Sequence, residues 1–235
     1  MGNTDGETRP GRGAGPGVSG GLDRVREVAR KDKDARFTAL LHHVGFQRLV
    51  LAFDGLRKDA APGADGVSWA EYGQDWQENL RGLHGRVQSG SYRAVPSRRV
   101  YIPNADGRLR PPGIASLEDK IVQRAVGEVL GAVFEAGFLG FSCGFRPGRS
   151  QHDALDALAV GLGTKVNRVL DADIRGFFDH LDREWLMRFL RHRIADERVL
   201  RLVTKWLNAG VLEDGQWSDS GEGTPQGGSV TPPTQ

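Results

Sequence analysis

The residues best suited to chemistry are two aspartates, Asp171 and Asp173, in the run Val-Leu-Asp-Ala-Asp-Ile-Arg-Gly-Phe-Phe-Asp at residues 169–179. Side chains alternate along a strand, so a strand here would place both carboxylates on one face and Leu170, Ala172 and Ile174 on the other. Carboxylate oxygens are the hard ligands that Mg²⁺ prefers, and two-metal phosphoryl transfer needs them on a rigid element. The spacing therefore predicts a metal site on a strand at residues 167–174.

Two other interpretations of this run exist. In the first, Asp171 pairs with a neighbouring arginine, and Asp179 or Asp182 caps the following helix; this alternative stays open. In the second, aspartates and a glycine fall at the first, third, sixth, ninth and twelfth positions of a calcium-binding loop. The calcium interpretation fails in detail, because Arg175 stands where the fifth position needs an oxygen ligand and Asp182 is shorter than the usual bidentate glutamate.

Two further features could contact phosphates. The block Gly-Thr-Pro-Gln-Gly-Gly at residues 223–228 lacks the Lys-Ser/Thr ending of a nucleotide-binding loop, and no Asp or Glu follows it. Partner carboxylates for Asp173 are therefore not expected there. Basic side chains also gather in three stretches, where they suit either phosphates or a solvated helix face: Arg98, Arg99, Arg108 and Arg110; Arg146 and Arg149; Arg188, Arg191, His192 and Arg193.

Helices are predicted from apolar spacing and capping residues. Residues 1–21 contain almost no large apolar side chain and are expected to be a disordered leader, followed by two short helices over residues 22–56. A helix over residues 68–87 should end at Gly90. Four further helices are expected behind capping residues: Ser116 with Asp119, Ser150 with Asp153, Asp182 (burying Trp185, Leu186, Phe189 and Leu190), and Asp196.

Two hairpins are predicted from turn residues. Asp106-Gly107 separates residues 98–103 from residues 108–114, and a short hairpin is expected around Trp217. The glycines and proline of residues 61–67 indicate a loop entering the body of the protein.

Composition sets modest limits on function. The net charge of +2 excludes few classes of function. The single cysteine, Cys143, permits no internal disulfide and suits a reducing compartment. No apolar run approaches the length of a membrane span, and we expect a cytoplasmic protein without membrane contact.

Six blocks of the chain resemble, in order, the successive motifs of bacterial group II intron reverse transcriptases, a retron-type family whose members also act as maturases. The blocks are residues 61–67, 92–114, 117–125, 142–150, 173–179 and 223–228, so the resemblance covers about residue 22 to about residue 230. It implies an α+β fold: a helical N-terminal extension at residues 22–90, then right-hand polymerase fingers and a partial palm at residues 91–235. The family's Tyr-Ala-Asp-Asp block, thumb and maturase domain are absent, and we expect a truncated copy.

The resemblance also implies roles for particular residues. Asp173 would be the first catalytic, metal-binding aspartate, with the Ile174 carbonyl beside it and Mg²⁺ as cofactor. Phe178 would exclude a 2′-hydroxyl, Arg110 would clamp the triphosphate and Gln226 would contact the incoming nucleotide. The residues expected to bind RNA are Arg98, Arg99, Arg108, Arg146 and Arg149. Three positions depart from the family pattern: Asn104 replaces a usual lysine, Pro112 a leucine and Cys143 a tyrosine.

The resulting hypothesis is a group II intron-type RNA-directed DNA polymerase, whose partners are intron-like RNA, a DNA primer and deoxynucleoside triphosphates. We expect this chain by itself to be catalytically incomplete, because Asp173 lacks partner carboxylates. The alternatives are a non-catalytic RNA-binding maturase-like fragment and a remnant without function. The sequence leaves the oligomeric state open.

Overall fold

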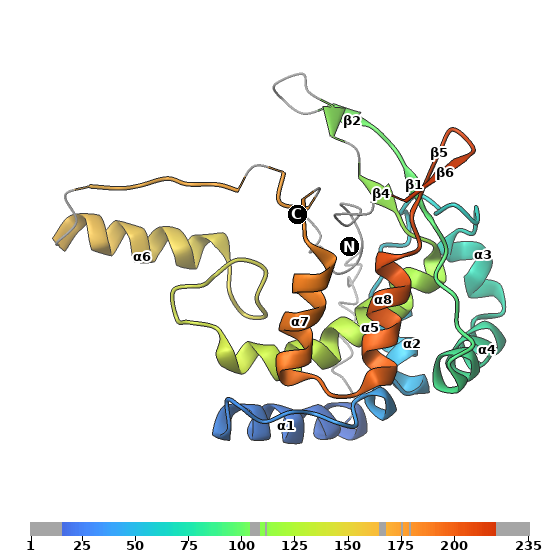
Figure 1. Cartoon of the computed structure of the whole chain (residues 1–235), viewed down its shortest axis with the longest axis horizontal. Helices are drawn as coiled ribbons and strands as arrows, with labels where there is room; N and C mark the ends of the chain where they lie inside the picture. Colours follow the sequence, from blue (N-terminus) through green and yellow to red (C-terminus); the bar gives the residue numbers. More distant parts are fainter. Residues whose placement is uncertain are drawn as a thin grey trace, which may run out of the picture.

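The computed structural model of the chain describes residues 16–103, 109–110, 112–164, 168–174, 176–178 and 180–219 (Figure 1). Its helices are α1 (Pro16–Lys31), η1 (Leu41–His43), α2 (Phe46–Asp54), α3 (Trp69–Gln74), α4 (Trp76–Ser89), α5 (Leu117–Phe134), η2 (Glu135–Gly137), α6 (Gln151–Thr164), α7 (Arg183–Arg193) and α8 (Glu197–Leu207). Its strands are β1 (Ser97–Arg99), β2 (Ile102–Pro103), β3 (Leu109–Arg110), β4 (Gly113–Ile114), β5 (Val211–Glu213) and β6 (Gln216–Ser218). The mixture of helices and a small sheet agrees with the α+β class, whereas the fingers and palm assignment and the domain boundaries stay predictions.

The core is built around α5, against which α1 and α2 pack (Figure 1). Apolar residues of α5 such as Ile121, Val122 and Val129 are fully buried, and the same cluster includes Leu49 of α2 and Leu200 of α8. α5 therefore acts as the central element on which the surrounding helices and the sheet are positioned.

Helix ends follow the capping residues that the sequence predicts. The Ser116, Asp182 and Asp196 side chains each accept a backbone N–H in the first turn of the helix that follows. Ser150 and Asp153 form a reciprocal capping pair at the start of α6. The helix predicted over residues 68–87 is instead two helices, capped by Ser68 and separated at Asp75.

Part of the predicted N-terminal leader is helical. Residues 16–21, assigned to the disordered leader, belong to α1, which is anchored by buried Leu22 and Val25. Residues 1–15 lie outside the described part of the chain. None of the described helices is both long enough and apolar enough to cross a membrane.

A four-stranded sheet in the order β4-β1-β5-β6 joins the two predicted hairpins. β1 pairs antiparallel with β4 and parallel with β5, and β2 pairs antiparallel with β3. The predicted hairpins are thus confirmed at their strands, while the Asp106-Gly107 turn lies outside the described residues. The parallel pair of β1 and β5 joins segments more than a hundred residues apart in sequence.

The strand predicted at residues 167–174 is wrong. Residues 168–174 have no assigned secondary structure and run as an extended segment beside α6, away from the body (Figure 1). A strand needs a neighbour to receive its backbone hydrogen bonds, and no described strand pairs with this segment. Its apolar face is consequently exposed, at 91% for Leu170 and 69% for Ile174.

Candidate nucleic-acid and metal site

The candidate metal-binding residues lie on the exposed segment between α6 and α7. Asp171, Asp173 and Ile174 are exposed and Phe178 is half-buried; the rings of Phe177 and Phe178 meet edge to face with centroids 5.3 Å apart. Within the described residues, no three His, Cys, Asp or Glu side chains come close enough to hold a metal ion. The Asp173 carboxylate and the Ile174 carbonyl are hard oxygen donors that suit Mg²⁺, but they offer only part of a coordination shell.

The predicted arginines of β1 are held by the protein itself. Arg98 is half-buried and donates from Nη2 to the Pro62 carbonyl at 2.8 Å, and Arg99 Nη1 lies 3.6 Å from Glu213 Oε2 on β5. The Tyr101 hydroxyl also donates to Glu213, and this hydrogen bond raises the pKa of Tyr101. These contacts fix the β1 side chains against the sheet and the loop at residues 61–66.

That loop is packed unusually closely on the start of α5. A Cβ added to Gly63 would lie 2.5 Å from the Ala115 carbonyl oxygen and 2.6 Å from Ser116 Cα, which explains why glycine is needed there. The Lys120 Nζ donates to the Ala61 carbonyl at 3.2 Å, and burial lowers the pKa of Lys120. The loop motif therefore serves to bring β1, β4 and the start of α5 together.

The second pair of predicted RNA-binding arginines divides into two different environments. Arg146 donates to Glu135 Oε1 at 2.7 Å and to the Ser142 carbonyl at 2.6 Å, and its side chain is only 10% exposed. Arg149, immediately before α6, is exposed, and no ion pair of its side chain is present among the described residues. Of the two, Arg149 is the side chain positioned to meet a ligand.

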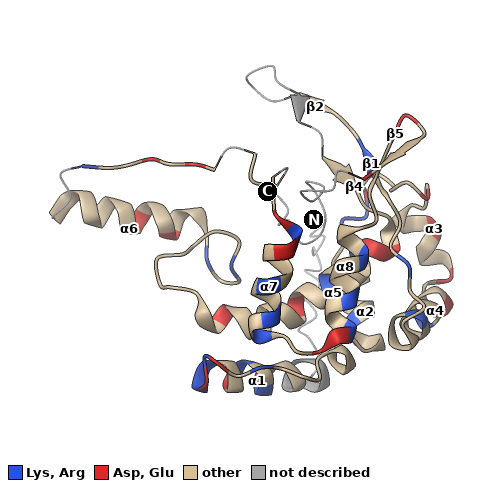
Figure 2. Cartoon of the chain, viewed as in Figure 1, with Lys and Arg blue, Asp and Glu red and all other residues tan. Residues whose placement is uncertain are grey.

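The basic stretches do not lie together. In Figure 2 the loop at residues 142–150 lies between α5 and α6, apart from strand β1 at the upper right. Arg108 and Gln226 fall outside the described residues, and only the backbone of Arg110, paired with Ile102, is described. The RNA-binding and nucleotide-binding roles of all these residues stay predictions.

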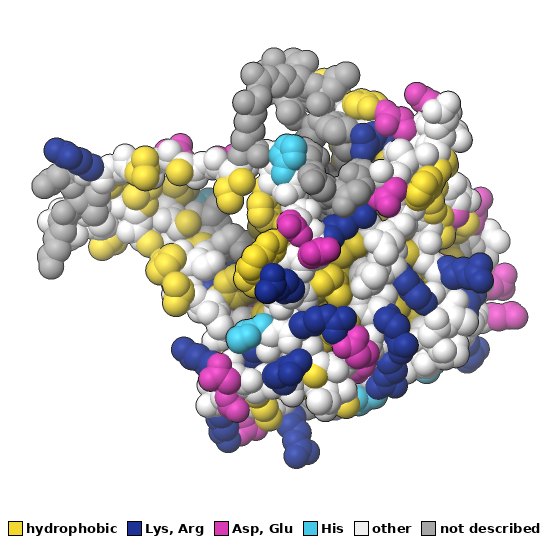
Figure 3. Space-filling model, viewed as in Figure 1, with side chains coloured by type: hydrophobic (Ala, Val, Ile, Leu, Met, Phe, Trp, Pro, Cys, Tyr) yellow, Lys and Arg dark blue, Asp and Glu magenta, His cyan; other side chains and the backbone are white. Residues whose placement is uncertain are grey.

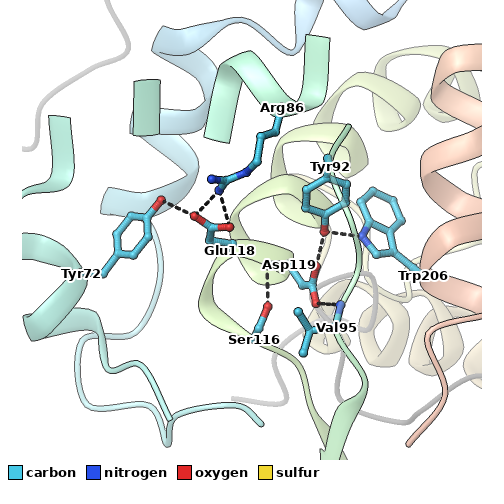
Figure 4. Close-up of polar contacts among 8 residues, drawn as sticks. All are labelled: Tyr72, Arg86, Tyr92, Val95, Ser116, Glu118, Asp119 and Trp206. Carbon is cyan, nitrogen blue, oxygen red and sulfur yellow. Dashed lines mark hydrogen bonds and ion pairs between the residues drawn. The ribbon is translucent and has the colours of Figure 1, made fainter. Parts of the chain in front are cut away.

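A buried polar network that sequence reasoning missed positions the entry to β1 (Figure 4). The Tyr92 hydroxyl donates to Asp119 Oδ1 and accepts a hydrogen bond from Trp206 Nε1 at 2.9 Å. The Val95 N–H donates to Asp119 Oδ2 at 3.0 Å, two residues before β1 begins. Burial raises the pKa of Asp119 even though these donors oppose it, and burial also raises the pKa of Tyr92.

Asp119 therefore does a different job from the one predicted for it. Its backbone N–H donates to the Ser116 hydroxyl oxygen, as expected for the cap. Its carboxylate, however, accepts hydrogen bonds from Tyr92 and Val95 instead of from the backbone at the start of the helix. The neighbouring Glu118 accepts hydrogen bonds from Arg86 at 2.6 Å and from Tyr72 at 3.3 Å. The first turn of α5 thus ties together α3, α4, β1 and α8.

Sequence comparisons give this geometry a family context. Residues 102–234 match the family model described as "Reverse transcriptase (RNA-dependent DNA polymerase)". The chain is 38% identical over 175 residues to Protein YkfC of Escherichia coli strain K12, covering 73% of this chain and 46% of that protein. It is 31% identical over 224 residues to the group II intron-encoded protein LtrA of Lactococcus lactis subsp. cremoris, covering 90% of this chain and 35% of LtrA. The chain thus spans less than half the length of these curated relatives.

Proposed function

Because the chain belongs to the group II intron reverse transcriptase and maturase family, we propose that it contributes RNA contacts and the first metal-binding aspartate to an RNA-directed DNA polymerase. The observation that carries this proposal is the family match over residues 102–234, which includes the exposed segment with Asp173. We also propose that the protein is located in the cytoplasm.

The proposed metal site uses the Asp173 carboxylate and the Ile174 carbonyl. Bound Mg²⁺ would neutralise the charge that develops on the transferred phosphate. Phe178 would form the wall beneath the sugar, while Arg110 and Gln226 would contact the incoming deoxynucleoside triphosphate. An RNA template and a DNA primer complete the proposed set of partners.

Primer extension tests the catalytic part of the proposal. We expect the purified chain alone to extend no DNA primer on an RNA template with Mg²⁺ and deoxynucleotides, because two-metal chemistry needs carboxylates in addition to Asp173. Extension that disappears in Asp173→Ala would contradict this expectation. A parallel Asp171→Ala variant would then show whether Asp171 serves as the second ligand.

A second candidate function is RNA binding without polymerisation, and the exposure of Arg149 favours it. RNA is gripped largely through its phosphates, so affinity should fall steeply with salt. We expect Arg149→Ala to weaken binding of several structured RNAs by a similar factor and to make the salt dependence shallower by about one counterion.

The control for this test is Arg57→Ala. Arg57 is also an exposed arginine, but it pairs with Asp59 at 3.1 Å. Coinciding filter-binding curves for Arg149→Ala, Arg57→Ala and the unchanged protein would remove Arg149 from the RNA-binding set. Arg146→Ala is less informative, since losing its bonds to Glu135 and to the loop carbonyls also alters the loop.

A further inference from the structure

One face of α7 carries exposed aromatic and basic side chains at helical spacing. Trp185, Arg188, Phe189 and His192 follow the spacing i, i+3, i+4 and i+7, so they form one stripe, here called the α7 stripe. Trp185 is 51% exposed and Phe189 is 65% exposed, contrary to the prediction that both are buried. Figure 3 shows hydrophobic and basic side chains side by side over this part of the molecule.

The stripe is not needed to hold α7 in place. The opposite side of the helix already packs on the core through Met187 and Leu190, and Arg193 at its end is buried and donates to the Ala35 carbonyl at 2.9 Å. An aromatic pair left in solvent on an otherwise anchored helix indicates a surface that meets something else.

The stripe also has a definite geometry. The Trp185 and Phe189 ring centroids lie 5.9 Å apart with the planes tilted by 35°, and the Arg188 guanidinium lies 4.3 Å from the Trp185 ring centroid. Arg188 forms no ion pair with any described carboxylate. Its charge is therefore available beside the Trp185 ring.

The charge of the helix selects one class of occupant. α7 contains four arginines and a single glutamate. By contrast, the exposed residues of α6, such as Leu155, Leu158 and Val160, are aliphatic, and its charged side chains are Asp153 and Asp156. Three of the four arginines are engaged within the protein: Arg183 pairs with Asp219, Arg191 pairs with Glu197, and Arg193 is buried. Arg188 is the arginine on the stripe itself, and a cation beside exposed aromatic faces suits single-stranded nucleic acid, in which bases stack and phosphates bind positive charge.

We propose that the α7 stripe binds unpaired RNA, with a base stacked on Trp185 or Phe189 and the adjoining phosphate contacted by Arg188. The stripe begins seven residues after Phe178 in the chain. This inference rests on the RNA-binding part of the proposed function and assigns it a separate surface, apart from the arginines of β1 and of the loop before α6.

Binding of three fluorescent probes tests the proposal. The probes are an adenosine homopolymer of about 12 nucleotides, an abasic ribose-phosphate strand of the same length, and a structured hairpin RNA. We expect the unchanged protein to bind the adenosine strand more tightly than the abasic strand. Trp185→Ala should weaken adenosine-strand binding by about 5- to 150-fold, the range for losing one stacked base, and should leave abasic binding nearly unchanged.

Matched variants separate stacking from other effects. Trp185→Phe should retain part of the affinity, whereas Trp185→Leu, which keeps apolar area without an aromatic face, should not. Phe141→Ala is the aromatic control, since Phe141 is 81% exposed outside the stripe. Arg81→Gln is the charge control for Arg188→Gln, because Arg81 is also exposed and lies 5.7 Å from an aromatic centroid, that of Phe46.

Three outcomes would overturn the proposal: equal affinity for the adenosine and abasic strands, full retention of binding by Trp185→Leu, or equal losses in Trp185→Ala and Phe141→Ala. Full retention by Trp185→Leu would point to a protein partner on the stripe. If hairpin RNA still binds while the stripe variants change nothing, this inference fails and the proposed function stands. If no RNA of any kind binds, the proposed function fails as well.

Discussion

Replacing Tyr92 with phenylalanine tests whether the buried network on α5 holds β1 in place. Tyr92 is 1% exposed, and its hydroxyl both donates to Asp119 and accepts from Trp206. Without that hydroxyl, Asp119 Oδ1 loses its donor in a buried site, while the half-buried Trp206 N–H can turn to water. Hydrogen bonds to charged groups contribute about 1.5–3 kcal/mol, and losing the second, neutral bond adds roughly 1 kcal/mol.

We therefore expect Tyr92→Phe to lower the free energy of unfolding by about 2.5–4 kcal/mol. For a chain of this size that corresponds to a fall in Tm of roughly 5–15 °C. Urea denaturation followed by circular dichroism measures it. Tyr101→Phe is the matched control, because Tyr101 is 51% exposed and its partner Glu213 is reachable by water; its effect on the free energy of unfolding should be much smaller than that of Tyr92→Phe.

The pH dependence gives this experiment a second readout. Burial raises the pKa of Asp119, so the folded state holds the proton more tightly than the unfolded chain. The stability that protonated Asp119 contributes is fully present below about pH 3.9, the pKa of an aspartate in the unfolded chain. It is lost as the pH rises through the pKa of Asp119 in the folded state. The Tyr92 hydroxyl stabilises the ionised form, so Tyr92→Phe should be more damaging at pH 7 than at pH 4.5. Equal losses in Tyr92→Phe and Tyr101→Phe at every pH would refute the reasoning.

Two further predictions concern the packing of backbone groups. Gly63→Ala should destabilise the fold by about 1–3 kcal/mol in urea denaturation, because its Cβ would collide with the Ala115 backbone; Gly85→Ala, on the open side of α4, should stabilise by about 0.5–1 kcal/mol. Burial alone would raise the pKa of Asp196, but the N–H groups of Leu41 and Leu40, together with the N–H and side chain of Arg198, outweigh burial and lower the pKa. Asp196→Ala should therefore cost about 1–3 kcal/mol above pH 4, and the loss should shrink as pH falls through the depressed folded pKa; a pH-independent loss would contradict this assignment.

Helix starts were predictable because their signals are local. Ser116, Ser150 and Asp182 act within three residues of their partners, so the sequence contains both members of each pair. The second task of Asp196 was not predictable, since its carboxylate also receives N–H groups from residues more than 150 positions earlier. A cap can be recognised from spacing, but a contact across the fold cannot.

The strand predicted at residues 167–174 was wrong for a related reason: a local pattern does not show whether a pairing partner exists elsewhere in the fold. Its alternating pattern is local and clear, yet a strand exists only when another segment completes its hydrogen bonds. Strands β1 and β4, which were predicted correctly, are partners of each other and lie close in sequence. No described element provides a partner for residues 168–174. Pattern therefore indicated which side chains share a face, while the presence of a neighbour decided whether that face was buried.

The exposed aromatics of α7 follow from this distinction. Amphipathic spacing placed Trp185, Leu186, Phe189 and Leu190 on one apolar face, but the helix settles on the core through Met187 and Leu190 and leaves the Trp185 edge in solvent. Apolar spacing indicates that a helix face can be covered by another surface. The charges beside that face indicate the chemistry of the covering surface. Arg188 lies over the Trp185 ring and has no described carboxylate partner. Covering the two rings with an apolar protein surface would therefore bury this cation without a counter-charge, a cost that a phosphate removes.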